Sequence, residues 1–129
     1  MLWEKFVLLV AISATTAVTR KTIGAVRTDP ELRWLLETVM RETWMVGRQR
    51  GVALADDLVA KTLAQADAFT PDMRASMAAD LEAGGRLEAP WLSGAVARMA
   101  REAGIDATAN RAIYAALRPY VDGSQGQTR

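Results

Sequence analysis

Few residues in this chain can do chemistry, because its 129 residues include no histidine and no cysteine. Imidazole acid–base catalysis, thiol catalysis and the usual transition-metal sites are therefore excluded. Carboxylates, hydroxyls, arginines and three lysines remain, and Lys5 is the lysine with the most apolar surroundings in sequence. The net charge of +1 gives no electrostatic reason to expect nucleic acid or an acidic membrane as a partner. A chain without cysteine is consistent with the reducing cytoplasm, where we expect this protein.

Lys5 stands directly before the apolar run FVLLVAI, residues 6–12. A lysine partly removed from water at this position would release a proton more easily near neutral pH, as a proton donor must. Leu9 and Ser13 follow one and two helical turns later, so they share its helix face. The alternative is a lysine at a helix end whose ammonium group extends into water.

A second group of polar residues surrounds a double-glycine turn in SMAADLEAGGRLEAPWLSG, residues 76–94. Ser76 and Asp80 lie one turn apart on one face of a predicted helix, and Glu88 follows Gly84-Gly85. Each also has an ordinary explanation: a surface hydroxyl, a solvated charge, and a carboxylate favoured by the dipole of the next helix. Spacing alone does not make them a site.

The elements that position these residues are predicted to be helices throughout, in an all-α bundle of about six. Helical periodicity and end signals such as Asp29-Pro30, Thr70-Pro71 and Gly84 define them. The predicted helices cover residues 2–19, 30 to about 47–51, 55–69, 71–83, 90–103 and 108–121. Residues 20–28 are predicted to be a connector, Thr108 to cap the last helix, and residues 122–129 to form a disordered tail.

Two segments leave alternatives open. The first helix is expected to be a buried core helix, since the apolar run from Phe6 to Ile12 is too short to cross a bilayer. A cleaved secretory leader is the alternative, and it would remove Lys5 and most of that helix. Trp34 and Met45 lie off the apolar stripe of the second helix, either packed on a neighbouring helix or forming a contact surface for another domain or subunit.

The order of these motifs resembles the C-terminal helical domain of the ketopantoate reductase (2-dehydropantoate 2-reductase) family. LWEKF, the long apolar helix, SMAADLEAGGRLEAPWLSG and AGIDATANRAIYAAL follow one another as in that family, over residues 2 to about 121. The most specific matches are Ser76-Met77, Asp80, Glu88, Gly94, Gly104-Ile105 and Asn110. The resemblance implies a fold like the C-terminal domain of 6-phosphogluconate dehydrogenase, serving as the substrate and dimerisation domain.

The resemblance also implies an activity and roles for individual residues. Family members reduce a 2-keto acid with hydride from NADPH, in pantothenate biosynthesis. Lys5 falls on the lysine that protonates the carbonyl oxygen, and Ser76, with Ser13 and Asp80, falls where substrate is held. Glu88 falls on the carboxylate at the cofactor end of the cleft. The implied partners are a small 2-keto acid, an N-terminal Rossmann domain and a second copy of the protein, with no metal, nucleic acid or membrane.

The departures from the family pattern refine this expectation. Leu9, Ser13 and Ile23 stand where family enzymes carry asparagines that grip the substrate, and Leu87 replaces a threonine. Alkyl groups in place of amides predict a more apolar 2-keto acid than ketopantoate. No strand followed by G-x-G-x-x-G occurs, so the NADP-binding domain is expected outside this chain, which should be inactive alone. The alternative is a non-catalytic helical interaction module derived from the same domain.

Overall fold

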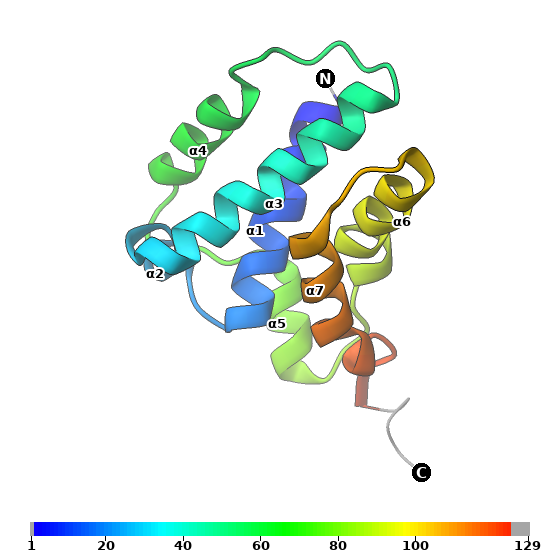
Figure 1. Cartoon of the computed structure of the whole chain (residues 1–129). Coiled ribbons are helices and arrows are strands. Elements are labelled where there is room, and N and C mark those ends of the chain that lie inside the picture. The colour runs from blue at the N-terminus through cyan, green and yellow to red at the C-terminus, as the bar shows by residue number, and fades with distance from the viewer. Residues whose placement is uncertain (1, 125–129) are drawn as a thin grey trace.

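The computed structural model describes residues 2–124. Over these residues the chain is all-α and has no strand, which confirms the predicted fold class (Figure 1). Residues 2–124 form seven α-helices rather than about six, with two short 3₁₀ helices. They are α1 (Leu2–Thr19), α2 (Ile23–Thr28), α3 (Pro30–Gln49), α4 (Leu58–Ala68), α5 (Ser76–Ala83), η1 (Ala89–Trp91), α6 (Ser93–Ala103), α7 (Thr108–Leu117) and η2 (Arg118–Tyr120).

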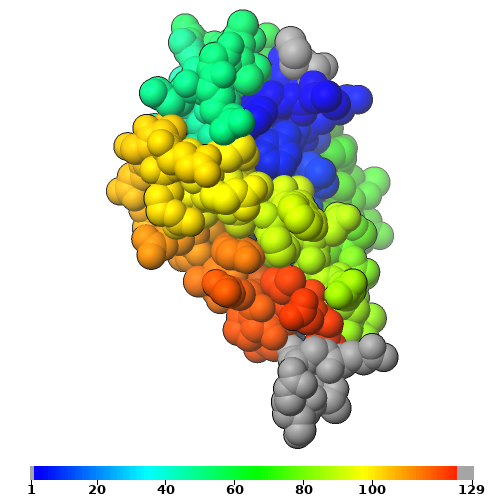
Figure 2. Space-filling model, turned by 90° about the vertical axis from the view of Figure 1, so that its right-hand side faces the viewer, coloured from blue at the N-terminus to red at the C-terminus, as the bar shows by residue number. Residues whose placement is uncertain are grey.

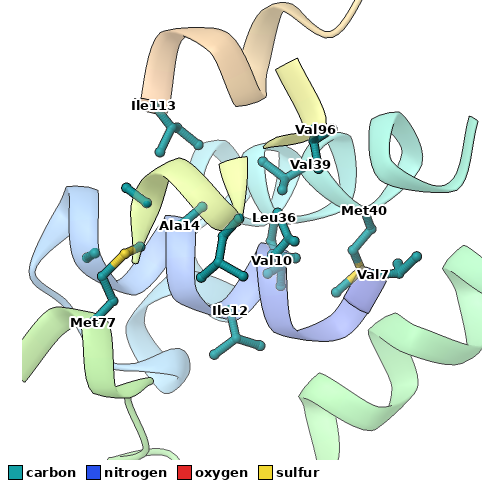
Figure 3. Close-up of a cluster of buried hydrophobic side chains, with 14 of the residues drawn as sticks. Val7, Val10, Ile12, Ala14, Leu36, Val39, Met40, Met77, Val96 and Ile113 are labelled. Carbon is teal, nitrogen blue, oxygen red and sulfur yellow. The ribbon is translucent and has the colours of Figure 1, made fainter. Parts of the chain in front are cut away.

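Helix α1 is the centre of the bundle and has the bounds predicted from the sequence. It packs on α3, α4, α5 and α7, and its residues from Val7 to Ala17 supply much of the core (Figure 3). Thr15 and Thr16 are fully buried, and each hydroxyl donates to the carbonyl four residues earlier, at 2.7 Å. An apolar helix enclosed on nearly every side can therefore carry hydroxyls without leaving them unpaired.

Helix α1 is also long and apolar enough, by length and composition, to cross a membrane. This test averages over all 18 residues of the helix, whereas the unbroken apolar run spans only residues 6–12. Half of it is buried inside the bundle, as expected of a core helix. No other helix within residues 2–124 meets the same test.

Helices α1 and α3 approach closely at Gly47. The indole of Trp3 lies where a β-carbon at Gly47 would stand, with its Nε1 nearest to that position. The same Nε1 donates to the carbonyl oxygen of Thr43 at 3.1 Å. Glycine is needed here for space, because any side chain would displace the tryptophan that joins the two helices.

The start of α3 confirms one sequence signal. Asp29 caps the helix, its carboxylate accepting from the amides of Glu31 and Leu32 at 2.9 and 3.1 Å, and Pro30 follows at the first position. The predicted connector before it was wrong, because residues Ile23–Thr28 form α2. The hydroxyl of Thr22 caps this short helix by accepting from the amide of Ala25 at 3.4 Å.

The signal at Thr70-Pro71 does not start a helix, contrary to the prediction. Two long-range hydrogen bonds hold this segment: Gly24 donates to the carbonyl of Pro71, and Ile23 to that of Met73, both at 2.8 Å. These contacts satisfy the first amides of α2, and the chain enters α5 only at Ser76. Tertiary pairing therefore overrides the local proline signal.

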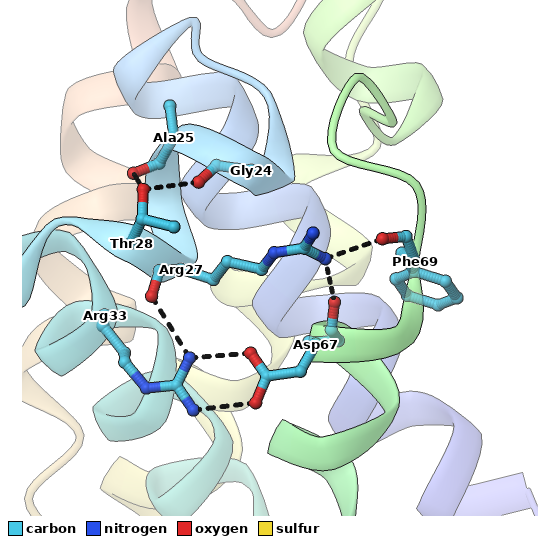
Figure 4. Close-up of polar contacts among 8 residues, drawn as sticks. Gly24, Ala25, Arg27, Thr28, Arg33, Asp67 and Phe69 are labelled. Carbon is cyan, nitrogen blue, oxygen red and sulfur yellow. Dashed lines mark hydrogen bonds and ion pairs between the residues drawn. The ribbon is translucent and has the colours of Figure 1, made fainter.

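Helices α2, α3 and α4 are joined by two arginines (Figure 4). Arg27 donates to the carbonyl oxygens of Ala66 and Phe69 at 2.9 and 2.7 Å, at the end of α4. Arg33 makes a two-pronged ion pair with Asp67, at 2.8 and 3.0 Å. The hydrogen bond from Arg33 lowers the pKa of Asp67, and the pKa of Arg33 is raised in return.

The N-terminus of α7 is not capped by Thr108, which instead donates to Asp106 at 2.9 Å. The carboxylate of Glu42, from the middle of α3, accepts from the amides of Ala109 and Asn110 at 3.0 and 2.9 Å. A residue far away in sequence therefore caps α7.

The first residues of the predicted tail contact the bundle. Ser124 donates from both its amide and its hydroxyl to the carbonyl oxygen of Gly84, at 2.8 and 2.9 Å. Residues 125–129 lie outside the described residues. Two helices begin later than predicted. Helix α4 begins at Leu58 rather than at residue 55, and α6 begins at Ser93, after η1, rather than at residue 90.

Candidate functional site

An open hollow of about 610 Å³ lies beside α5. We call it the acidic hollow. Its walls come from α5, from the segment between α5 and η1, from η1 itself and from the chain just after η2, which lie beside one another in yellow-green and red in Figure 2. The lining residues with polar side chains are Ser76, Asp80, Arg86, Glu88 and Asp122. Three residues singled out from the sequence, Ser76, Asp80 and Glu88, therefore meet in one concave surface.

The turn at the end of α5 brings Glu88 to this place. Gly84 ends the helix in the left-handed conformation, with φ of 73°, as predicted from the sequence. The next amide, of Gly85, donates to the carbonyl of Asp80 at 2.8 Å. Leu87 is buried, and its amide donates to Val121 at 2.9 Å, which fixes the returning chain against the C-terminal segment. Glu88 follows this anchor and is exposed.

Acceptors dominate the electrostatics of the acidic hollow. Three carboxylates, of Asp80, Glu88 and Asp122, stand against one guanidinium, of Arg86. Such a surface attracts ligand groups that donate hydrogen bonds, such as hydroxyls and amides. An anionic ligand group would need Arg86, the hydroxyl of Ser76, or cations from outside the hollow.

Lys5 and Ser13 are placed apart from the acidic hollow. Lys5 is exposed in the first turns of α1 and is not among the lining residues, while Ser13 is only 2% exposed inside the bundle. Leu9, between them on the same helix face, is 49% exposed. Figure 2 shows the blue first turns of α1 at the surface above the yellow-green segment that borders the hollow.

The exposure of Lys5 bears on its predicted chemistry. The partial removal of Lys5 from water that we expected is not provided by this chain, so it would require a second domain covering the same face. Within residues 2–124, no group of three or more acidic, histidine or cysteine side chains could hold a metal ion.

Sequence reasoning missed Trp91 and Asp122. Trp91 is 70% exposed at the edge of the hollow, and nothing in the local pattern separates an exposed tryptophan from a core one. Asp122 was assigned to a disordered tail on composition. Its position depends on the contacts of the neighbouring Val121 with Leu87 and of Ser124 with Gly84.

Comparison with known proteins adds the relatives of this chain. The 2-dehydropantoate 2-reductase of Archaeoglobus fulgidus is 30% identical over 122 residues, which cover 95% of this chain and 40% of that protein. A dimeric ketopantoate reductase from Staphylococcus aureus has the same fold, with a TM-score of 0.87 and 25% identity over 98% of this chain and 43% of its own. A ketopantoate reductase of the PanE/ApbA family from Ralstonia eutropha aligns with a TM-score of 0.85 and 31% identity, over 98% of this chain and 42% of its own.

These relatives are much longer than the present chain, which spans about two fifths of the Archaeoglobus protein. The family model described as the ketopantoate reductase PanE/ApbA C terminal matches residues 1–121, nearly the whole sequence. The expected all-α fold, the motif order and this match agree. The chain therefore belongs to the ketopantoate reductase family, as its helical C-terminal domain.

Proposed function

We propose that this chain is the substrate-binding domain of an NADPH-dependent reductase of 2-keto acids. The observation that carries the proposal is the convergence of Ser76, Asp80 and Glu88 on the acidic hollow. Membership in the ketopantoate reductase family supports the reaction class. The dinucleotide-binding Rossmann domain is proposed to precede residue 1 in the intact protein, with residues 1–121 as the helical domain and 122–129 as the tail.

The polar side chains of the acidic hollow fit a nicotinamide dinucleotide bound at the edge of the hollow. Glu88 and Asp122 offer carboxylate oxygens to ribose hydroxyls or to a carboxamide, and Arg86 offers a guanidinium to a phosphate. NADPH, when bound, supplies the hydride that reduces the carbonyl carbon. Glu88 is proposed to hold the cofactor end of the cleft, while most of the cofactor would rest on the Rossmann domain.

Lys5 is proposed to complete the reduction as the proton donor. Its ammonium group gives a proton to the carbonyl oxygen, which becomes the hydroxyl of a 2-hydroxy acid. The same positive charge stabilises the negative charge that develops on that oxygen. Because Lys5 is exposed in the helical domain, closure of the second domain over this face would bring it to substrate, and opening would let solvent reprotonate it.

The substrate carboxylate is proposed to lie near the start of α5. Ser76 is the first residue of this helix, and the N-cap residue Ala75 makes no side-chain cap hydrogen bond. Helix N-termini favour anions, and the Ser76 hydroxyl adds a donor at the same place. Asp80, one turn later, would accept from a donor group of the substrate. Ser13 is buried inside the bundle, so it would influence the substrate only through the residues of α1 that cover it.

The substrate is proposed to be more apolar than ketopantoate. Leu87, Pro90, Trp91 and Val121 give the hollow an apolar wall beside its carboxylates. Leu9, exposed on the Lys5 face, offers a further apolar contact where the family carries an amide. An alkyl side chain at position 9 cannot pair a substrate hydroxyl as an amide would, so this position no longer selects for ketopantoate.

We propose that the intact reductase is a cytoplasmic homodimer. The Staphylococcus aureus relative is described as dimeric. A chain without cysteine fits the reducing cytoplasm. The test of the function is turnover by the intact two-domain protein with NADPH, comparing ketopantoate with 2-keto acids that carry plain alkyl or aryl groups. We expect a higher kcat/KM for the apolar substrates. Equal efficiency with ketopantoate would refute the substrate preference, and no reduction of any 2-keto acid would favour the non-catalytic interaction module.

A further inference from the structure

The segment after η2 folds back along the turn that follows α5 and forms one wall of the acidic hollow (Figure 2). We call residues 121–124 the C-terminal latch. The amide of Leu87 donates to the carbonyl oxygen of Val121 at 2.9 Å. Ser124 donates to the carbonyl oxygen of Gly84 from its amide and its hydroxyl, at 2.8 and 2.9 Å. The latch is therefore fastened at both of its ends, which fixes the backbone at Asp122 between them.

Gly123 allows this close approach. Its φ of 76° lies in the left-handed region, which favours glycine. A β-carbon at Gly123 would also stand 2.7 Å from the carbonyl oxygen of Gly84 and 3.0 Å from the carbonyl carbon of Gly85. Both constraints act at the residue next to Asp122. A side chain at position 123 would therefore push the Asp122 carboxylate away from its place in the wall of the hollow.

The latch sets two opposite charges side by side. Its two fastened ends pair with the turn in opposite chain directions, and two residues lie between them on each side, Gly85-Arg86 and Asp122-Gly123. Gly123 lies against Gly85. Arg86 and Asp122 therefore take the neighbouring positions, and both line the acidic hollow. Within residues 2–124, neither of these two side chains makes an ion pair.

A guanidinium beside a carboxylate offers hydrogen-bond donors and acceptors at one place. The ribose and phosphate groups of a dinucleotide need both, because a phosphate accepts from arginine and a ribose hydroxyl donates to a carboxylate. The reacting end of a 2-keto acid, by contrast, presents only acceptors, which give Asp122 nothing to accept. Glu88, proposed above at the cofactor end of the cleft, lies only two residues after Arg86. The pair is therefore suited to the cofactor rather than to the substrate.

We propose that the C-terminal latch is part of the cofactor site, where it holds Asp122 beside Arg86 so that the two side chains bind a ribose hydroxyl and a phosphate of the dinucleotide. This role rests on the NADPH-dependent reduction proposed above, and it gives a function to residues that composition alone placed in a tail. Asp122 and Arg86 contact the cofactor, whereas Gly123 is a positioning residue. Because none of the three touches the reacting atoms, they set the affinity for NADPH and leave the chemical step unchanged.

The first test is a fluorescence titration of the intact two-domain protein with NADPH. We expect Asp122→Asn and Arg86→Gln each to raise the dissociation constant about 10-fold, while kcat at saturating NADPH stays within about twofold of wild type. Asp106→Asn and Arg111→Gln, which change exposed charges elsewhere, should bind as wild type does. Unchanged affinity in both Asp122→Asn and Arg86→Gln refutes the latch alone. A wild-type protein that binds no NADPH refutes the proposed cofactor itself.

The second test moves the latch and keeps its charges. Gly123→Ala should weaken NADPH binding about as much as Asp122→Asn, and the two changes together should cost little more than either one, since both remove the same contact. A Gly123→Ala protein that is helical by circular dichroism and binds NADPH normally overturns the positioning role. Exchanging the charges, with Arg86→Asp and Asp122→Arg, separates a ligand contact from a stabilising ion pair. We expect the exchanged protein to bind weakly, and recovery of wild-type affinity would show that the pair only stabilises the latch.

Discussion

One oxygen of Glu42 holds Asn110 twice: Oε1 accepts from the backbone amide at 2.9 Å and from the side-chain Nδ2 at 2.8 Å. The other oxygen accepts from Ala109 at 3.0 Å, so a single carboxylate from α3 caps α7. Glu42 is 8% exposed and Asn110 fully buried. The contact fixes α7 against α3 on one side, and α7 leads directly into η2 and the C-terminal wall of the acidic hollow. It therefore links α3 to the candidate site.

Replacing Glu42 should lower the free energy of unfolding more than replacing Asn110. Glu42→Ala leaves two helix amides without their acceptor, and we expect a loss of about 3 kcal/mol in the free energy of unfolding. Asn110→Ala should cost less, because the Oδ1 of Asn110 is buried without a partner among the described residues and its removal relieves that burden. Urea unfolding followed by circular dichroism measures both, with the partly exposed Glu37→Gln as control. A larger cost for Asn110→Ala would contradict this account.

Replacing Gly47 by alanine tests the close approach of α1 and α3. Glycine within a helix is normally improved by alanine, but here the new β-carbon would meet the Trp3 indole. We expect Gly47→Ala to destabilise by about 2 kcal/mol, because Trp3 must move and lose its bond to Thr43. Thermal unfolding beside Gln49→Ala, at the exposed end of α3, gives the comparison. A stabilised Gly47→Ala protein would show that Trp3 does not wedge the two helices.

The ion pair of Asp67 with Arg33 predicts a dependence on pH. Because the pair lowers the pKa of Asp67, its contribution is complete above the unfolded pKa of about 4 and disappears as pH falls through the lower folded value. Both side chains are more than a third exposed, so solvent limits the contribution to less than about 1 kcal/mol. Asp67→Asn should be less stable than wild type at pH 7, and the difference should vanish in strong acid. Asp72→Asn, in the exposed turn before α5, should match wild type at pH 7.

Lys5 should matter for turnover and little for cofactor affinity. In the intact reductase we expect Lys5→Ala to lower kcat about 10²- to 10⁴-fold, as loss of a proton donor does. Lys5→Arg should not restore activity, because a guanidinium keeps its proton. Steady-state kinetics and NADPH fluorescence titration measure the two effects, with Lys21→Ala as the control. Unchanged kcat in Lys5→Ala would remove this lysine from the mechanism.

Leu9 should influence which 2-keto acid is preferred. It is half-exposed on the Lys5 face, so Leu9→Asn leaves little cavity in the bundle. An amide there could pair the hydroxyl of ketopantoate, and we expect the ratio of kcat/KM for ketopantoate over an alkyl 2-keto acid to rise about 10-fold. Leu2→Asn, at a highly exposed position of the same helix, serves as control. An unchanged ratio would mean that this position does not contact substrate.

Local signals along the chain determined much of the fold. The long apolar run of α1 indicated its bounds, Asp29-Pro30 indicated the start of α3, and Gly84 indicated the end of α5. These features follow from interactions within one or two helical turns, which a sequence displays directly. The motif order likewise placed Ser76, Asp80 and Glu88 together as candidates, and they do line one hollow.

Only the tertiary structure decided which residues far apart in sequence meet. Pro71 accepts a hydrogen bond from α2 instead of starting a helix, Glu42 caps α7 in place of Thr108, and Ser124 joins Gly84 beside the acidic hollow. It likewise decided that Trp34 remains exposed. Buried amides and carbonyls must find partners wherever the packed bundle offers them, and that choice depends on the arrangement of whole helices rather than on neighbouring residues.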